Sequence, residues 1–123
     1  MSKKVLIADD ELNIVISLEF LLRREGFEVL VAVNGEDALA KARAERPDLV
    51  LLDVMMPKMN GFDVCQALRS DPELASMRVL MLTGKGRETE VSKGLELGAN
   101  GYMTKPFSTK DLVAQVRLLL EAK

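Results

Sequence analysis

Short apolar runs alternate with longer amphipathic stretches along the whole chain. Five runs are rich in aliphatic and β-branched residues or are bounded by turn signals, and they cover residues 5–8, 28–33, 49–52, 79–82 and 101–103. The stretches between them carry apolar residues at helical spacing, so the chain alternates strand and helix five times. Because the third run is apolar throughout, we expect its strand to be buried on both faces. The pattern predicts a doubly wound α/β sandwich, in which helices cover a parallel sheet.

Capping and breaking residues mark the ends of the predicted helices. Gly26 stands where the first helix should end, Asn34 precedes the second helix, and Ser108 opens the last one. The buried face predicted for the last helix consists of Leu112, Val116 and Leu119. A fourth helix is expected near residues 87–97. It contains Gly94, and since glycine costs about 1 kcal/mol relative to alanine in a helix, we expect this helix to be the most mobile.

Composition narrows the class of protein. A chain of 123 residues with 48% apolar residues can fill one core, so we expect a single domain over residues 1–123. The net charge of −2 does not favour nucleic acid, and no apolar run approaches the ~18 residues of a membrane span. Histidine is absent, which excludes histidine bases and phosphohistidine carriers. The single cysteine, Cys65, fits a reducing compartment, so we expect a cytoplasmic location.

Polar side chains follow most of the predicted strands. Asp9 and Asp10 follow the first strand, Asp53 the third, Thr83 the fourth, and Lys105 comes shortly after the fifth. Because the carboxyl ends of parallel strands meet at one edge of a sheet, we expect these groups to lie together. Clustered carboxylates repel one another, and a hard divalent cation such as Mg²⁺ relieves that repulsion. The ammonium and hydroxyl groups would bind an anion, so the pattern indicates a phosphoryl group on or against a carboxylate.

Each of these residues also has an ordinary structural interpretation. An aspartate after a strand commonly forms a turn or caps a helix, and Thr83 with Gly84 fits a simple turn. Lys105 fits a solvated surface charge. The spacing alone leaves both interpretations open.

Four separated motifs resemble those of the receiver domain of two-component response regulators, the CheY-like domains. They are Val-Leu-Ile-Ala-Asp-Asp-Glu at 5–11, Leu-Leu-Asp-Val-Met-Met-Pro-Lys-Met-Asn-Gly at 51–61, Met-Leu-Thr-Gly at 81–84 and Gly-Ala-Asn-Gly-Tyr-Met-Thr-Lys-Pro-Phe at 98–107. The resemblance covers essentially the whole chain. It implies a (βα)5 fold of the flavodoxin or CheY type, with a five-stranded parallel sheet of order 2-1-3-4-5. It also implies a signalling module that is not an enzyme beyond its own phosphorylation and dephosphorylation.

The resemblance assigns roles around a metal ion. Asp53 corresponds to the phosphoacceptor of a histidine-to-aspartate phosphorelay. Asp10 corresponds to a direct ligand of Mg²⁺ (or Mn²⁺), with Asp9 binding mostly through water, and Met55 would offer its backbone carbonyl. Phosphoryl transfer needs positioning and charge neutralisation more than covalent chemistry from the protein, which agrees with these roles.

Further roles concern the bound phosphate. Thr83, Gly84 and Lys105 correspond to the phosphate-binding positions, and Tyr102 to the aromatic residue that changes rotamer when the threonine moves. The bond before Pro106 is expected to be cis. Pro57 and Gly61 correspond to structural positions of the loop after the third strand.

The first helix carries two apolar stripes. Ile14, Leu18 and Leu21 form the expected core stripe, and a second stripe on nearly the opposite face consists of Leu12, Ile16 and Phe20. The second stripe is either partly buried under a neighbouring loop or a docking surface for the helical bundle of a histidine kinase or histidine phosphotransfer protein.

Other functions remain as alternatives. An aspartate-nucleophile phosphohydrolase commonly has a second aspartate two positions beyond the nucleophile, where this chain has Met55. A flavodoxin-like carrier of FMN would place its phosphate where Asp9, Asp10 and Glu11 would repel it. A receiver-like binding scaffold without phosphorylation is the third alternative.

The expected downstream partner is a separate protein or a covalently linked output domain. A homodimer that forms on phosphorylation is a further option, and we expect no direct binding of nucleic acid or membrane. The face made by the fourth helix, fifth strand and fifth helix is the expected output surface.

Overall fold

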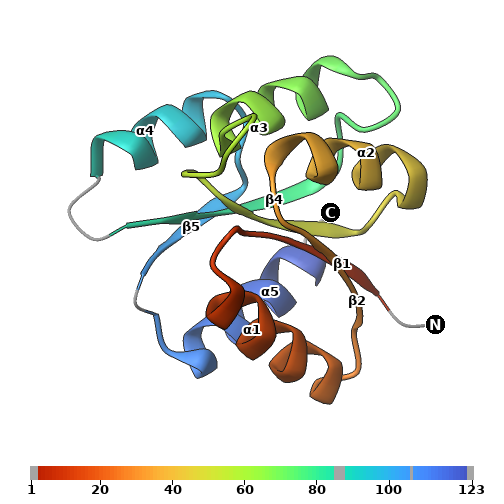
Figure 1. Ribbon diagram of the computed structural model, residues 1–123, viewed down its shortest axis with the longest axis vertical. Helices are drawn as coiled ribbons and strands as arrows, with labels where there is room; N and C mark the ends of the chain where they lie inside the picture. Colours follow the sequence, from red (N-terminus) through yellow and green to blue (C-terminus); the bar gives the residue numbers. More distant parts are fainter. Residues whose placement is uncertain (1–2, 85–87, 106, 122–123) are drawn as a thin grey trace.

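Strands and helices alternate along the chain as the sequence pattern predicts (Figure 1). The structure is a computed structural model and describes residues 3–84, 88–105 and 107–121. The elements are β1 (Lys4–Ala8), α1 (Leu12–Arg24), β2 (Glu28–Ala32), α2 (Gly35–Glu45), β3 (Leu49–Asp53), α3 (Gly61–Ser70), β4 (Arg78–Thr83), α4 (Glu88–Glu96), β5 (Gly101–Thr104) and α5 (Thr109–Glu121). All strand pairs are parallel and the order is β2-β1-β3-β4-β5, which confirms the predicted fold.

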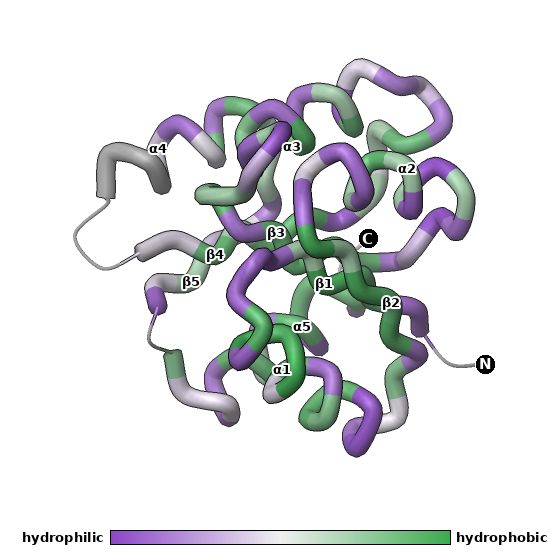
Figure 2. Tube along the Cα trace, viewed as in Figure 1, coloured by the Kyte–Doolittle hydropathy of each residue, from purple (hydrophilic) through white to green (hydrophobic). Residues whose placement is uncertain are grey.

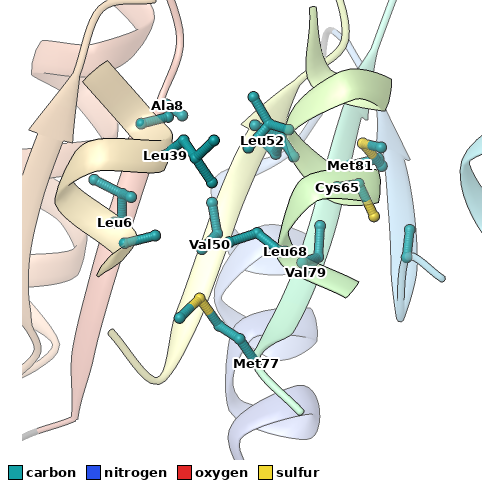
Figure 3. Close-up of a cluster of buried hydrophobic side chains, with 14 of the residues drawn as sticks. Leu6, Ala8, Leu39, Val50, Leu52, Cys65, Leu68, Met77, Val79 and Met81 are labelled. Atoms are coloured by element: carbon teal, nitrogen blue, oxygen red, sulfur yellow. The ribbon is translucent and has the colours of Figure 1, made fainter. Parts of the chain in front are cut away.

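Helices cover both faces of the sheet. α1 and α5 lie on one face, and α2, α3 and α4 lie on the other (Figure 1). The strands between them form the apolar centre of the molecule (Figure 2). One buried cluster joins β1, β3 and β4 to α2 and α3 through residues such as Leu39, Leu52 and Leu68 (Figure 3). The second cluster joins the opposite face to α1 and α5, so the sheet is fixed from both sides.

The central strands extend slightly further than the sequence pattern predicts. Every residue of β3 is buried, and this strand ends with Asp53, paired in register with Leu82. β4 likewise ends with Thr83, which pairs with Thr104. Both site residues are therefore the last members of strands and not the first members of loops. Ladder hydrogen bonds fix their backbone, which makes the edge of the sheet a rigid base for the site.

The predicted caps of the helices are confirmed. The Oδ1 atom of Asn34 accepts a hydrogen bond from the Asp37 amide at 2.8 Å, and the Ser108 hydroxyl accepts one from the Asp111 amide at 3.0 Å. Each bond satisfies an otherwise free amide in the first turn of a helix. Gly26 follows α1 with φ +94°, the left-handed conformation that ends many helices.

The core stripe predicted for α1 is confirmed in part: Leu18 is buried, and Ile14 and Leu21 pack against the same core cluster. The buried residues of this helix are Val15, Leu18 and Leu22. Ile14 and Leu21 are only half-buried, because they lie at the side of the helix and line a hollow beside Phe107. The helix is thus rotated so that its buried face is centred on the sheet, while one flank looks toward the segment before α5.

The second stripe of α1 is exposed. The exposed fractions of Leu12, Ile16 and Phe20 are 66%, 55% and 67%. Burial under a neighbouring loop, one of the two interpretations of this stripe, is therefore wrong. An apolar row on the surface of a small domain is typical of an interaction site.

Gly94 of α4 lies at the point where this helix meets the sheet. The residue is buried, and a β-carbon there would lie 3.4 Å from Cγ of Met81. This is an ordinary van der Waals distance, so the contact between α4 and β4 leaves room for an alanine at this position. The predicted first residue of this helix, 87, lies outside the described residues, and the mobility of α4 stays a prediction.

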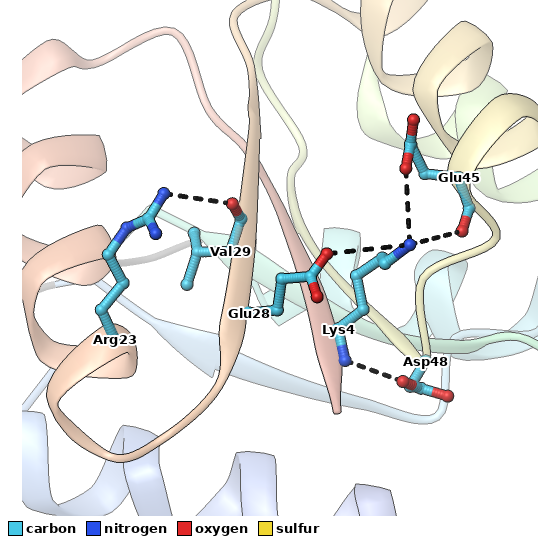
Figure 4. Close-up of polar contacts among 6 residues, drawn as sticks. All are labelled: Lys4, Arg23, Glu28, Val29, Glu45 and Asp48. Carbon is cyan, nitrogen blue, oxygen red and sulfur yellow. Dashed lines mark hydrogen bonds and ion pairs between the residues drawn. The ribbon is translucent and has the colours of Figure 1, made fainter. Parts of the chain in front are cut away.

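Polar contacts tie together the opposite edge of the sheet, where the strands begin (Figure 4). Nζ of Lys4 lies 3.4 Å from Oε1 of Glu45 and 3.8 Å from Oε2 of Glu28, and the Lys4 amide donates to Asp48 at 2.7 Å. One ammonium group thus joins the first residues of β1 and β2 to the end of α2. No helix in the described part of the chain has the length and apolar character of a membrane span.

Candidate functional site

Three carboxyl groups converge at the carboxyl edge of the sheet. Asp9 and Asp10 follow β1, Asp53 ends β3, and these two strands are neighbours. One carboxylate oxygen from each residue lies within 4.8 Å of the others. Asp9 is fully buried, Asp53 is 5% exposed, and Asp10 is exposed. The structure therefore confirms the predicted convergence and opens the cluster to solvent on one side.

Lys105 reaches into this cluster from the end of β5. Its Nζ atom lies 2.9 Å from Oδ2 of Asp9 and 3.4 Å from Oδ1 of Asp53. Its backbone amide donates to the Thr83 carbonyl at 2.7 Å, which fixes the start of the side chain. Burial alone would lower the pKa of Lys105, but hydrogen bonds to Asp9 and Glu11 and the nearby carboxylate charges outweigh it and raise the pKa to about 12. Lys105 is therefore a permanent cation beside Asp53.

Glu11 also contacts Lys105, although no role in the site was predicted for it. Its Oε1 atom lies 3.0 Å from Nζ of Lys105. Glu11 precedes α1, and its amide donates to Oδ1 of Asp9 at 2.9 Å, so the chain turns back toward the site. The sequence feature that could have indicated this contact is a third acidic residue directly after Asp9 and Asp10.

The environment of Asp53 makes its ionisation costly. Burial is the largest cause, the negative charge of Asp9 adds to it, and together they raise the pKa of Asp53 to about 7. The charge and hydrogen bond of Lys105 and a hydrogen bond from the Met55 backbone oppose this shift without cancelling it. A cation bound beside Asp53 would remove the penalty, because an opposite charge at close range favours the carboxylate.

Thr83 offers an unused hydrogen-bonding group at the same edge. Its side chain is buried, and among the described residues its Oγ1 atom has no hydrogen-bond partner. A buried hydroxyl without a partner costs about 1–3 kcal/mol, so such a group fits a ligand oxygen better than an empty site. Gly84, the next residue, is half-buried and has no side chain to obstruct that ligand.

The loop between β3 and α3 completes the edge of the site. The Met55 side chain is exposed, while its backbone hydrogen-bonds the Asp53 carboxyl group. The Gly61 amide donates to the Val54 carbonyl at 2.8 Å, and a β-carbon on Gly61 would lie only 2.5 Å from the Asp53 carbonyl oxygen. Gly61 therefore permits α3 to begin directly against the end of β3, which agrees with the structural role expected for it.

One expected site residue, Tyr102, lies away from the carboxylates. Tyr102 is 47% exposed on β5, where it lines a hollow shared with Leu95 and Gln115. Its role as a switch stays a prediction. Pro106 lies outside the described residues, so the prediction of a cis bond before it is not tested.

The residues at this edge fit a hard divalent cation. Asp9, Asp10 and Asp53 supply carboxylate oxygens, and the backbone of Met55 lies at the same edge, where it hydrogen-bonds the Asp53 carboxyl group. Oxygen donors of this kind suit Mg²⁺ and Mn²⁺, which bind through one or two carboxylates and keep several waters. The partly exposed Asp10 leaves room for those waters.

The strand order, together with acids and a lysine at the carboxyl edge, defines the class of CheY-like α/β signalling domains. Residues 5–117 match the family model described as response regulator receiver domain. The chain belongs to this family, so it is a receiver domain of two-component response regulators.

Individual relatives agree with this assignment. The chain is 48% identical over 120 residues to the alkaline phosphatase synthesis transcriptional regulatory protein PhoP of Bacillus subtilis (strain 168). That match covers 98% of this chain and 49% of the relative, so the chain spans about half the length of the curated relative. The chemotaxis response regulator CheY4 of Vibrio cholerae has a similar structure, with a TM-score of 0.91, 34% identity, and coverage of 97% of this chain and 99% of that one. The BeF3-activated DrrB receiver domain gives a TM-score of 0.88 at 33% identity, covering 99% and 100%.

Proposed function

We propose that Asp53 accepts a phosphoryl group from a phosphohistidine of a partner protein, in a reaction that depends on Mg²⁺ or Mn²⁺. The observation that carries this proposal is the position of the Asp53 carboxylate, 3.4 Å from Nζ of Lys105 and within 4.8 Å of both Asp9 and Asp10 oxygens. The end of β3 holds this carboxylate at the carboxyl edge of the sheet. In this proposal the domain is a signalling module that catalyses its own phosphorylation and dephosphorylation.

The transfer needs no general base in this chain. An oxygen of the ionised Asp53 attacks phosphorus, the P–N bond to the imidazole breaks, and its electron pair returns to the imidazole nitrogen of the partner. The product is an acyl phosphate on Asp53. Lys105 moves from Asp9 to the transferred phosphoryl oxygens and neutralises part of their charge.

We assign the metal ligands as the resemblance implies. Asp10, Asp53 and the Met55 carbonyl would hold the ion directly, and Asp9 would do so mostly through water. The metal would supply further neutralisation of the phosphoryl oxygens. The chain's own contribution is to keep three carboxylates in place against their mutual repulsion.

The switch begins at Thr83. Phosphorylation adds acceptor oxygens beside the unpartnered Thr83 hydroxyl, which donates to one of them. Movement of this hydroxyl opens space for Tyr102 to change rotamer. Because Tyr102 lies on β5 next to the hollow between α4 and α5, this change alters the α4-β5-α5 face.

The exposed stripe of α1 supports a docking surface for the phosphodonor. Leu12, Ile16 and Phe20 form an exposed apolar row on α1, which begins two residues after Asp10. A helical bundle that carries the donor histidine can bury this row while its histidine reaches Asp53. A histidine kinase or a histidine phosphotransfer protein has this chemistry.

We further propose that the α4-β5-α5 face contacts an output domain, a separate target or a second phosphorylated copy. The named relative, a transcriptional regulatory protein, supports an output domain, since it is about twice as long as the matched segment.

A cytoplasmic location agrees with the single cysteine. Cys65 is buried, and its burial raises the pKa of the thiol.

The experiment that tests the function is incubation with Mg²⁺ and acetyl phosphate, followed by intact-mass measurement. The wild type is expected to gain one phosphate and Asp53→Asn none. Release of inorganic phosphate without a phosphorylated protein would instead support a phosphohydrolase. A wild type that gains nothing from either acetyl phosphate or a phosphorylated histidine kinase would support a binding scaffold.

A further inference from the structure

The loop between β3 and α3 rests on the first turn of α2. Gly35, the first residue of α2, lies so close to this loop that a β-carbon on it would overlap the carbonyl oxygen of Met59 and would lie 2.5 Å from its Cβ. Real β-carbons do not approach other atoms this closely, so a side chain at position 35 would push the loop away. The Gly35 amide also donates to the Pro57 carbonyl at 3.4 Å.

A second contact strengthens the same junction. Nζ of Lys58 lies 3.8 Å from Oε1 of Glu36, the second residue of α2. Lys58 has a φ of +71°, the left-handed conformation that a lysine adopts only when its surroundings favour it. Gly35 itself has no positive φ, so its lack of a side chain serves the contact with Met59 and not the backbone conformation.

The loop transmits this contact to the phosphoacceptor. The Val54 amide donates to the Leu82 carbonyl at 3.1 Å, which fixes the start of the loop on β4. Met55 then hydrogen-bonds the Asp53 carboxyl group through its backbone. The path from α2 to the phosphoacceptor therefore runs along the loop from Met59 to Met55, whose backbone contacts the Asp53 side chain.

We infer that Gly35 is a positioning residue for phosphoryl transfer, because the absence of its side chain seats the β3–α3 loop that holds the Met55 backbone against Asp53. The inference rests on the function proposed for Asp53. It predicts that the start of α2, which supplies no ligand, sets both metal affinity and the rate of phosphorylation. A small shift of the reacting group is enough to slow such a reaction strongly.

The test compares Gly35→Ala with Gly94→Ala, the same change at another buried helical glycine. At position 94 the added methyl group makes ordinary van der Waals contact with the Met81 side chain, 3.4 Å away, and with the Phe62 ring, 3.7 Å away. Mg²⁺ affinity is measured by titration calorimetry, and the phosphorylation rate by intact mass at saturating acetyl phosphate. Gly35→Ala is expected to bind Mg²⁺ about fivefold more weakly and to react about tenfold more slowly, while it keeps cooperative thermal unfolding. Gly94→Ala is expected to match the wild type in both readouts.

A second pair of variants avoids the packed glycine and needs no change inside the core. Glu36→Lys replaces the attraction to Lys58 by repulsion and is expected to weaken Mg²⁺ binding about twofold at low salt. The charge swap Glu36→Lys with Lys58→Glu restores the pair and is expected to restore the affinity. These variants decide the question even if Gly35→Ala does not fold.

The outcomes separate the inference from the proposed function. Wild-type behaviour of Gly35→Ala, an equal loss in Gly94→Ala, or a charge swap that fails to restore binding would each overturn the positioning role alone. A wild type that neither binds Mg²⁺ nor gains phosphate would overturn the proposed function and the inference with it.

Discussion

Nζ of Lys105 lies 3.0 Å from Oε1 of Glu11, although the two residues are 94 positions apart in the sequence. Lys105 must release Glu11 to bind a phosphoryl group on Asp53, and the Glu11 charge also repels such a group. Glu11→Gln is therefore expected to bind beryllofluoride, a phosphoryl mimic, about two- to fivefold more tightly in the presence of Mg²⁺. Fluorine NMR titration measures this affinity.

Lys105→Ala is the control for this competition. This substitution removes the cation that receives the anion. The affinity for beryllofluoride is therefore expected to fall at least tenfold, which corresponds roughly to the loss of one charge-assisted hydrogen bond. Weaker binding by Glu11→Gln than by the wild type would show that Glu11 helps to place the ammonium group and does not compete for it.

Metal binding is expected to depend on pH near neutrality. The pKa of Asp53 is about 7 in the metal-free protein, and only the ionised form is a good ligand. The apparent Mg²⁺ affinity is therefore expected to fall about tenfold for each pH unit below 7, with release of one proton per bound ion. Calorimetry in two buffers of different ionisation enthalpy measures both quantities. A constant affinity between pH 5.5 and 8, values that bracket the pKa of about 7, would contradict this account.

The same residue makes the metal-free domain less stable at high pH. The folded-state pKa of Asp53 lies above the ordinary value of 3.8, so the native protein binds more protons than the unfolded chain between about pH 4 and 7. Its stability must fall as the pH rises through this window. Asp53→Asn is thus expected to raise the free energy of unfolding by about 2–4 kcal/mol at pH 8 and by much less at pH 4. Urea unfolding at both pH values tests the sign, and equal gains at both would refute it.

The exposed stripe of α1 is expected to matter only for a protein donor. Replacing Ile16 and Phe20 with serine removes apolar surface that a helical bundle would bury, so transfer from the phosphorylated cognate kinase should fall at least tenfold. Phosphorylation by acetyl phosphate should be unchanged, because the small donor makes no such contact.

Leu118→Ser is the matched control for this stripe, since Leu118 is an equally exposed leucine on α5. Transfer from the kinase to this variant should equal transfer to the wild type. A parallel loss with both donors in the Ile16 and Phe20 variant would mean that the substitutions damage the site or the fold, and the docking surface would be wrong.

The sequence predicted the fold and the main cluster because both follow from local signals. Buried strands read as apolar runs, and the topology of a parallel sheet then brings Asp10, Asp53 and Lys105 to one edge. The contact between Gly35 and Met59 could not be predicted in this way, because it depends on the path of the β3–α3 loop and on its distance from the first turn of α2. The sequence feature connected with this contact is a glycine at the first position of a predicted helix.

The incomplete prediction for the core face of α1 has a similar origin. Helical spacing correctly identified two apolar stripes, but it could not say how far the helix is rotated about its axis. Packing against the sheet buries Val15 and Leu22. Ile14 faces the hollow near Phe107 and stays half-buried. Rotation is a property of the assembled core and not of the helix sequence.

Mapping the phosphorylated atom tests the central proposal most directly. An acyl phosphate on an aspartate is reduced by borohydride to homoserine, whereas phosphoserine and phosphothreonine are not. After phosphorylation in Mg²⁺ buffer, reduction and proteolysis, mass spectrometry is expected to find homoserine at position 53 and at no other aspartate. Homoserine at position 9 or 10, or phosphate that survives on a hydroxyl group, would contradict the assignment of Asp53 as the phosphoacceptor.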